Sequence, residues 1–207
     1  MINYFRHFLL VISNYRLSSI VIIFFEVIYV IFYDNYYNKI HFSKIKKATS
    51  AISIPFYIIK IIEKFINKKK IIRICDLGFG RGKNLYYFSL QKKYDIEGIE
   101  LDKELFDQFI LKNKNENKPK IYNNDILEYN FEKNNFDLLI LNDPFVNHDD
   151  YKKLLQKFIN YNYKNYLVFI NLDFVKQKIV KNFCEIIEIK KFSRTRNVIF
   201  AKINGGP

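Results

Sequence analysis

A segment with three alternating glycines, Ile71–Asp102, constrains the fold of this 207-residue chain more than any other feature. An apolar run leads into Asp76, glycines follow at positions 78, 80 and 82, a helical stretch comes next, and a second short apolar run ends at Glu100. Glycine lets the backbone turn sharply and approach a ligand, and the start of a helix offers N–H groups. An acid about 20 residues further on can accept hydrogen bonds from ribose hydroxyls. The pattern predicts a site for the nucleoside half of a cofactor.

The spacing of the glycines distinguishes between cofactors. A dinucleotide fingerprint, G-x-G-x-x-G, would place its third glycine at Lys83, whereas this chain has that glycine one position earlier, at Gly82. A P-loop is excluded because Asn84, not serine or threonine, follows Lys83, and because Gly78 stands one residue too close. The remaining pattern, D-L-G-x-G-x-G, resembles the first motif of the class I S-adenosylmethionine-dependent methyltransferases. The resemblance extends from about Ile71 to Ile203.

This resemblance implies an α/β fold: a Rossmann-like, doubly wound, mostly parallel seven-stranded sheet that ends in an antiparallel hairpin. The residue pattern agrees with alternating strands and helices, and the apolar run Phe136–Leu141 is typical of a buried parallel strand. We expect an N-terminal hydrophobic helical extension over residues 1–50 and a methyltransferase domain over residues 51–204. Expected strands cover residues 71–75, 97–99, 121–126, 136–141, 166–170, 184–189 and 197–203, the last two joined across 193–196, and expected helices include 56–66, 103–113 and 151–158.

Helical spacing also predicts which side chains face the core. Pro55 opens the helix at Phe56, whose inward residues are expected to be Ile58, Ile59, Ile61, Ile62 and Phe65. In the helix 103–113 the inward residues are expected to be Leu105, Phe106, Phe109 and Ile110. In the methyltransferases that the chain resembles, the helix before the first strand commonly covers the cofactor pocket. Tyr57 is therefore a candidate lid residue, with a core aromatic as the alternative.

The resemblance further implies which residues hold the cofactor, S-adenosyl-L-methionine. Asp125 with Ile126 matches the acid after the third strand that receives the adenine amino group in the family, although an acid at the start of a loop is also a common helix cap. Cys75 and Cys184 lack a C-x-x-C partner, and no histidine stands at metal-ligand spacing, so we predict no metal site. The predicted cofactor-binding residues are Asp76, Gly78, Phe79, Gly80, Gly82, Asn84, Glu100, Leu101, Asp125, Ile126 and Asn142.

The four residues Asn142-Asp143-Pro144-Phe145 follow the fourth expected strand and are the predicted catalytic set. They resemble the N-P-P-F/Y motif of methyltransferases that act on amino groups, in which the asparagine and a backbone carbonyl hold the target nitrogen and the aromatic ring stacks on the target. Asp143 replaces the first proline, which is closer to the looser N-x-P-F ending of other relatives. We predict that Asn142 orients the acceptor and that Asp143 accepts its proton. An Asx-type turn closed by Pro144 is the structural alternative and is compatible with function.

The predicted function is transfer of a methyl group to a nitrogen or oxygen of a protein side chain or small molecule. A nucleic-acid amino-methyltransferase is one alternative, and a non-catalytic nucleoside-binding, membrane-docked module is another. The net charge of +13 invites the nucleic-acid interpretation. However, the lysines are scattered, and the joint abundance of Lys, Ile, Asn, Phe and Tyr is typical of an A/T-rich coding sequence. Charge alone is therefore weak support for nucleic acid, and a protein or small-molecule acceptor is favoured because Asp143 replaces the first proline and no target-recognition domain is recognisable.

The apolar stretch Leu17–Tyr33 raises the question of a membrane span. It falls just short of the ~20 apolar residues that a bilayer needs, and Glu26 stands at its centre, where burial in lipid costs several kcal/mol. No small-residue cleavage site of a signal peptide follows it. We expect an amphipathic or buried helix packed on the catalytic domain, or one that associates with a membrane surface through residues 8–33. The expected location is cytoplasmic, with membrane association as a variant.

Overall fold

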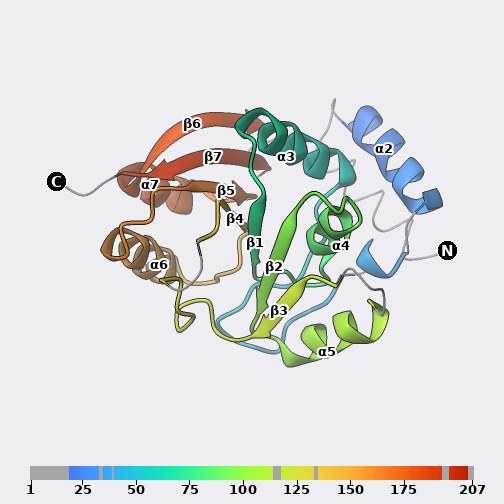
Figure 1. The fold of residues 1–207 in the computed structure, drawn as a ribbon, viewed down its shortest axis with the longest axis horizontal. Helices are drawn as coiled ribbons and strands as arrows, with labels where there is room; N and C mark the ends of the chain where they lie inside the picture. Colours follow the sequence, from blue (N-terminus) through green and yellow to red (C-terminus); the bar gives the residue numbers. More distant parts are fainter. Residues whose placement is uncertain are drawn as a thin grey trace.

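A seven-stranded sheet with the order β3-β2-β1-β4-β5-β7-β6 forms the centre of the chain (Figure 1). The computed structural model describes residues 19–32, 35–38, 40–113, 118–132, 135–192 and 196–204. Neighbouring strands from β3 to β5 are parallel, whereas β7 runs antiparallel to both β5 and β6. The predicted mostly parallel sheet with a terminal hairpin is confirmed, and residues 193–195 of the expected turn at 193–196 lie outside the described residues. The strands are β1 (Arg73–Leu77), β2 (Asp95–Glu100), β3 (Lys120–Asn123), β4 (Leu138–Leu141), β5 (Tyr166–Ile170), β6 (Cys184–Lys191) and β7 (Asn197–Ile203).

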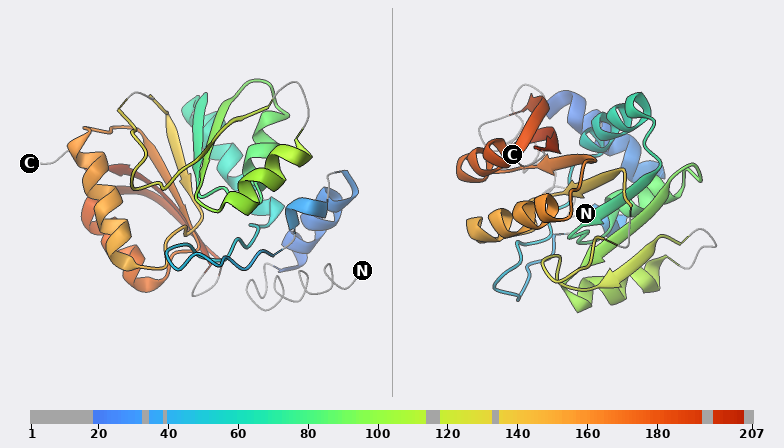
Figure 2. Two further views of the ribbon diagram at one scale, coloured as in Figure 1. Left: turned by 90° about the horizontal axis from the view of Figure 1, so that it is seen from below. Right: turned by 60° about the vertical axis from the view of Figure 1, so that its left-hand side comes forward.

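Helices cover both faces of the sheet (Figure 2). Side chains alternate across a strand, so Ile74 of β1 joins the apolar layer under α3 and α4, whereas Cys75 and Leu77 join the layer under α6 and α7. Both faces of the central strands are thereby buried, which explains the continuous apolar run in β4. The helical elements are α2 (Ser19–Phe32), the 3-10 turn η2 (Asn35–Asn38), α3 (Phe56–Lys69), α4 (Lys83–Ser89), α5 (Lys103–Lys112), α6 (His148–Asn160) and α7 (Phe174–Phe183).

The helical spacing predicted most inward residues correctly. In α3, all the predicted inward residues are buried except Ile61, which is half-buried. In α5, Leu105 and Phe109 are buried and Phe106 packs against the core, but the prediction for Ile110 was wrong, because its side chain is 45% exposed. Ile110 follows Phe109 directly and is therefore rotated about 100° around the helix, away from the buried stripe.

Helix α2 packs on α3 and turns its single charged residue inward. The Glu26 side chain is fully buried and accepts a hydrogen bond from the backbone N–H of Phe56, at the N-terminus of α3. A carboxylate is stabilised there by the unpaired N–H groups of the first helical turn. The acid that argued against a lipid-spanning helix therefore faces protein. Among the described helices, none combines the length and the apolar character that crossing a bilayer requires.

Residues 40–54, here called the strap, connect the N-terminal helices to α3 without regular secondary structure. The strap folds back on itself through a bridge between His41 and Ala51, and a second bridge joins Ala48 to Phe145. The Thr49 hydroxyl donates to the backbone carbonyl of Asp143 at 2.6 Å. The strap is thereby fastened across the chain that leaves β4, and the expected boundary between residues 50 and 51 falls inside it.

Candidate cofactor and methyl-transfer site

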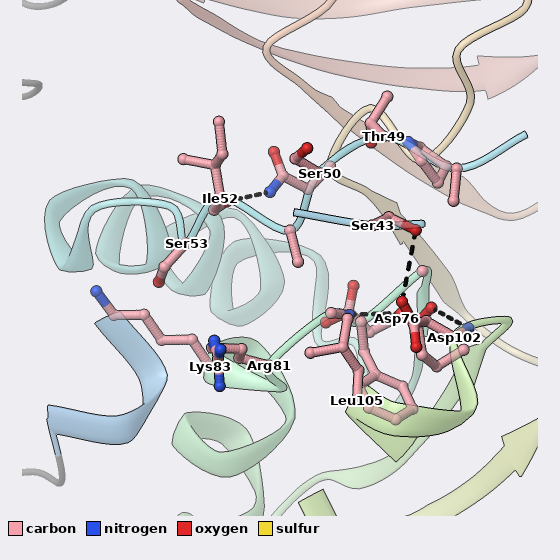
Figure 3. A pocket seen from close by; sticks show the side chains of 18 of the residues that line it. Ser43, Thr49, Ser50, Ile52, Ser53, Asp76, Arg81, Lys83, Asp102 and Leu105 are labelled. Carbon is pink, nitrogen blue, oxygen red and sulfur yellow. Dashed lines mark hydrogen bonds between the residues drawn. The ribbon is translucent and has the colours of Figure 1, made fainter. Parts of the chain in front are cut away.

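Two adjoining cavities open where β1, β2 and β4 end. The first lies between the glycine turn, the start of α4 and the strap (Figure 3). The second lies beside it, between β2, the turn after β3 and the chain after β4. Both are lined by Ala48, Gly78, Glu100 and Pro144, so these four residues mark their junction. In an open parallel sheet this edge is where ligands bind.

The glycines of the turn bring its backbone against the opposite wall. Gly78 has φ +75°, and a Cβ atom on it would lie 2.8 Å from the Cβ of Pro144. A Cβ on Gly80 would lie 3.0 Å from that of Ala51 in the strap. Gly82, also at φ +75°, is the N-cap residue of α4. Larger residues would therefore be strained at all three positions, and at Gly78 and Gly80 they would also push the turn away from Pro144 and the strap.

Asp76 and Asn84 form a buried polar pair in the first cavity. The Asn84 amide donates to Asp76 Oδ2 at 3.2 Å. Asp76 Oδ1 and Asn84 Oδ1 are also buried, but neither accepts a hydrogen bond within the described part of the chain. Burial raises the pKa of Asp76 to about 7, against the opposing hydrogen bond from Asn84. The cavity thus presents two acceptor atoms that suit a ligand carrying N–H donors, such as the ammonium group of an amino acid.

Glu100 lies at the junction of the two cavities. Its carboxylate accepts hydrogen bonds from the backbone N–H groups of Gly80 at 2.7 Å and of Asp102 at 2.8 Å. Burial raises the pKa of Glu100, and these two N–H groups oppose that effect. A carboxylate has about four lone-pair positions, so two backbone donors leave acceptor capacity for hydroxyl groups of a ligand.

The second cavity contains three further predicted cofactor residues, whereas Gly82 lines neither cavity. Leu101, Asp125 and Ile126 line the second cavity together with Leu127. Asp125 Oδ1 accepts from the N–H of Leu127 at 2.9 Å, and Lys47 Nζ approaches Asp125 Oδ2 at 3.4 Å. Asp125 is therefore both the cap of a local turn and a wall of the cavity, and its predicted contact with the adenine amino group stays a prediction.

Asn142 and Pro144 line the first cavity, Phe145 lines the second, and Asp143 lines neither. The Asn142 amide donates to the carbonyl of Ile52 at 3.2 Å and accepts from Asn171 at 3.1 Å. Phe145 is only 5% exposed, and its ring packs edge-on against Tyr151. Its predicted stacking on an acceptor stays a prediction.

Asp143 is held by a buried lysine. Its carboxylate accepts hydrogen bonds from Lys176 Nζ at 2.6 Å and from the Tyr151 hydroxyl at 2.9 Å. Burial raises the pKa of Asp143, and the Lys176 ammonium opposes that effect. Its backbone φ is +44°. These contacts hold the turn that follows Asn142. The Asp143 carboxylate lines neither cavity, so the structure does not place it for the predicted proton transfer.

Several cavity residues come from parts of the chain that carry no recognisable motif. The strap contributes hydroxyl side chains at positions 43, 49, 50 and 53, which Figure 3 shows above the glycine turn. The imidazole of His41 lies 3.1 Å from Asp102, which also lines the cavity. Tyr57, the candidate lid residue, packs its ring against Phe25 and Phe192 and lines neither cavity, in agreement with the alternative of a core aromatic. The strap, not the helix α3, covers the pocket.

Lys83 connects the cavity to α2. It is the first residue of α4, lines the first cavity and is 4% exposed. Its ammonium lies 3.3 Å from a carboxylate oxygen of Glu26 and 4.3 Å from the ring centroid of Tyr29. Burial lowers the pKa of Lys83, and the Glu26 charge opposes that effect. The position where a dinucleotide fingerprint has glycine thus carries a buried cation that anchors α2.

Acidic, histidine and cysteine side chains do not gather into a metal site anywhere in the described residues, because no group of three comes together. Cys75 and Cys184 are both buried, as expected for core thiols.

Comparison with known proteins gives a match to one family over part of the chain and a shared fold over most of it. Residues 74–161 match the sequence profile of the family described as methyltransferase domain. No curated protein matches the chain. Among solved structures, magnesium protoporphyrin IX methyltransferase from Synechocystis PCC 6803, determined with bound S-adenosylmethionine, superimposes with a TM-score of 0.57 at 13% identity. That match covers 72% of this chain and 79% of the other.

Two further structures share the fold at lower or similar identity. The methyltransferase domain of bacterial CtHen1 has a TM-score of 0.57 at 7% identity, over 70% of this chain and 97% of that domain. The StiE O-methyltransferase segment has a TM-score of 0.56 at 11% identity, over 70% of this chain and 72% of that segment. Structural matches at sequence identities this low show that the fold is shared, and they carry no information about the methyl acceptor.

Proposed function

The chain carries a class I, Rossmann-like S-adenosylmethionine-dependent methyltransferase domain, and from that premise we propose that it methylates a nitrogen or oxygen atom of a protein side chain or small molecule. The observation that carries the proposal is the pair of joined cavities with Glu100 at their junction. A nucleoside bound there presents its ribose hydroxyls to Glu100, its adenine to the second cavity and its amino-acid end to the first. Asp76 Oδ1 and Asn84 Oδ1 supply the acceptors for the ammonium group at that end.

The proposed chemistry needs positioning more than acid or base groups. When bound, S-adenosylmethionine supplies a methyl group on a sulfonium, which is already electrophilic. The chain must hold an acceptor in line with that methyl group and exclude water, and proximity of this kind can lower a barrier by about 7–11 kcal/mol. Asn142, held by Ile52 and Asn171 at the edge of the first cavity, is the side chain we assign to orienting the acceptor. The predicted roles of Asp143 and Phe145 are not part of this proposal.

A nucleic-acid acceptor is the weaker alternative, and the backbone at Asp143 is the reason. Asp143 has φ +44°, whereas the proline ring fixes φ near −65°. The turn after β4 therefore differs in conformation from one that carries proline at this position, and Phe145 lies in the core. The features that suggested a base-binding N-P-P-F/Y motif thus do not support a flipped base in this chain.

Calorimetric titration with S-adenosylhomocysteine tests the cofactor half of the proposal. We expect binding by the unmodified chain and at least about tenfold weaker binding after Glu100→Ala, because hydrogen bonds to a charged group contribute about 1.5–3 kcal/mol. Glu97→Ala is the matched control, since Glu97 is a buried acid on the same strand but outside both cavities. An unmodified chain that fails to bind S-adenosylhomocysteine would favour the non-catalytic alternative.

A methyl-transfer assay then identifies the acceptor class. Tritiated S-adenosylmethionine is incubated with separate protein, nucleic-acid and metabolite pools, and label is counted in each. Label in the protein or metabolite pool supports the proposal, and label confined to nucleic acid overturns it. The Glu100→Ala chain provides the background in each pool.

A further inference from the structure

The outer face of α2 is apolar and exposed. Ile20, Val21, Phe24 and Val27 have exposed fractions of 78%, 48%, 62% and 42%. The opposite face of the helix, with Ile22, Glu26 and Tyr29, is fully buried. Because Glu26 is the only charged residue of α2, the exposed face carries no charge at all. A contiguous apolar face of this kind on a surface helix marks an interaction site.

The strap, which follows α2 and η2 in the chain, presents positive charge and an exposed aromatic ring. Lys44, Lys46 and Lys47 are exposed, Phe42 is 75% exposed, and residues 40–54 contain no acid. Figure 2 (left view) shows the strap running along one side of the molecule toward the end that α2 occupies. The segment that carries the exposed lysines and the helix that carries the exposed apolar face are therefore close in the chain, and the strap runs toward that helix.

We propose that α2 and the strap form a surface that docks on an anionic lipid bilayer, with α2 lying in the plane of the interface. Interfacial helices bury an apolar face among the lipid headgroups and acyl chains, and nearby lysines are attracted to anionic headgroups. The exposed face of α2 supplies the first requirement, and Lys44 and Lys46 supply the second. The inward Glu26 remains satisfied in this arrangement, because it stays against Phe56 and Lys83.

The same side chains fit other partners less well. Nucleic acid uses lysines and aromatic rings, but aliphatic side chains such as Ile20 and Val27 neither stack on bases nor pair with them. A second copy of the chain would cover the aliphatic face, but the net charge of +13 on each copy opposes self-association. A bilayer with anionic headgroups satisfies both the apolar and the basic part of the surface.

Docking in this way would place the roof of the first cavity at the membrane. The strap covers that cavity and also carries the lysines, so an acceptor held in the bilayer surface would meet the cofactor site directly. This consequence rests on the proposed methyltransferase function, whereas the docking itself does not.

Co-sedimentation of the 207-residue chain with vesicles tests the docking. We expect binding to vesicles of phosphatidylcholine and phosphatidylserine in equal parts and much weaker binding to phosphatidylcholine alone. Phe24→Ser should weaken binding by about tenfold or more, since a buried phenylalanine contributes roughly 1.5–3 kcal/mol. Leu111→Ser is the matched control, because Leu111 is 67% exposed at the end of α5.

The basic part of the surface has its own pair of variants. Lys46→Gln should weaken binding by about fivefold, because each lysine near an anionic surface contributes about 1 kcal/mol. Lys181→Gln removes the same charge from an exposed position in the last turn of α7 and should leave binding unchanged. Failure to bind anionic vesicles overturns the proposal, as do a dimer that Phe24→Ser dissociates and equal losses from a variant and its control. S-adenosylhomocysteine titration of the same samples reports separately on the cofactor site.

Discussion

The two walls of the first cavity are specified in different ways. The wall formed by the glycine turn and Glu100 comes from one continuous segment, in which a strand, a tight turn and a helix follow one another. The wall formed by the strap is assembled from contacts between distant residues, such as Thr49 with Asp143 and Ala48 with Phe145. The first wall requires particular residue types because its backbone conformation allows no others, whereas the second requires only that the strap be held in place.

The largest effect, on the free energy of unfolding, is expected from Gly82→Ala, at the end of the glycine turn behind the first wall. A Cβ atom there would lie 2.2 Å from a ring carbon of Phe109, and the residue has φ +75°. Strain of about 1–2 kcal/mol from the left-handed backbone and about 1–3 kcal/mol from overpacking predict a loss of about 2–5 kcal/mol in the free energy of unfolding. Urea denaturation measures it.

The double variant Gly82→Ala/Phe109→Leu separates the two contributions. The smaller side chain removes the overlap but not the backbone strain, so relative to Phe109→Leu alone the glycine substitution should cost only about 1–2 kcal/mol. If the loss on substituting Gly82 is the same in both backgrounds, the packing explanation is wrong. If there is no loss in either background, the glycine wall does not depend on its backbone conformation.

The contrast between the walls also explains what could be predicted from sequence. The sheet, the positions of Asp76 and Glu100, and the cavity-lining position of Asp125 follow from patterns within a few residues, so they were predictable. The pair between Glu26 and Lys83 joins residues 57 positions apart, and the strap has no periodicity that would assign it to a wall. The direction of Phe145 depends on the positive φ of Asp143, which residue type alone does not reveal.

The second prediction concerns the link between α2 and the glycine wall. In Glu26→Gln the side chain keeps its size, but Lys83 loses the charge that holds it at the amino-acid end of the first cavity. Because charged hydrogen bonds contribute about 1.5–3 kcal/mol, we expect the dissociation constant for S-adenosylhomocysteine to rise at least about tenfold. Adenosine, which lacks the amino-acid end, should bind as it does to the unmodified chain. Calorimetry with both ligands makes the measurement.

If the affinity for S-adenosylhomocysteine and the affinity for adenosine fall by the same factor, Glu26 only supports the fold. Glu63→Gln is the matched control, because Glu63 is a buried acid in α3 that does not line the first cavity. We expect that variant to leave the ratio of the two dissociation constants unchanged.

The third prediction uses the titration of Asp76. Its pKa is raised to about 7, so the carboxylate is increasingly protonated below that pH and attracts an ammonium group less strongly. The affinity for S-adenosylhomocysteine should therefore fall by up to about tenfold from pH 7 to pH 6, and Asp76→Asn should remove this dependence.

The stability of the unliganded chain should change in the opposite direction. A carboxyl whose pKa is raised in the folded state favours folding below its unfolded pKa, and that contribution is lost as the pH rises toward 7. Calorimetry between pH 6 and pH 7 measures the affinity, and thermal unfolding over the same range measures the stability. If affinity and stability change with pH in the same direction, Asp76 is not the group responsible.

The smallest effect is expected at the strap's contact with the second cavity. Lys47 Nζ lies 3.4 Å from Asp125, but the lysine side chain is 67% exposed, so water and salt screen the pair. Lys47→Met should change the dissociation constant for adenosine by less than about fivefold, because exposed ion pairs contribute at most about 1 kcal/mol. Asp125→Asn should have the larger effect, since that carboxylate also caps the turn at Leu127. A larger loss from Lys47→Met than from Asp125→Asn would show that the strap contacts the nucleoside itself, and the two walls would then share the recognition of adenine.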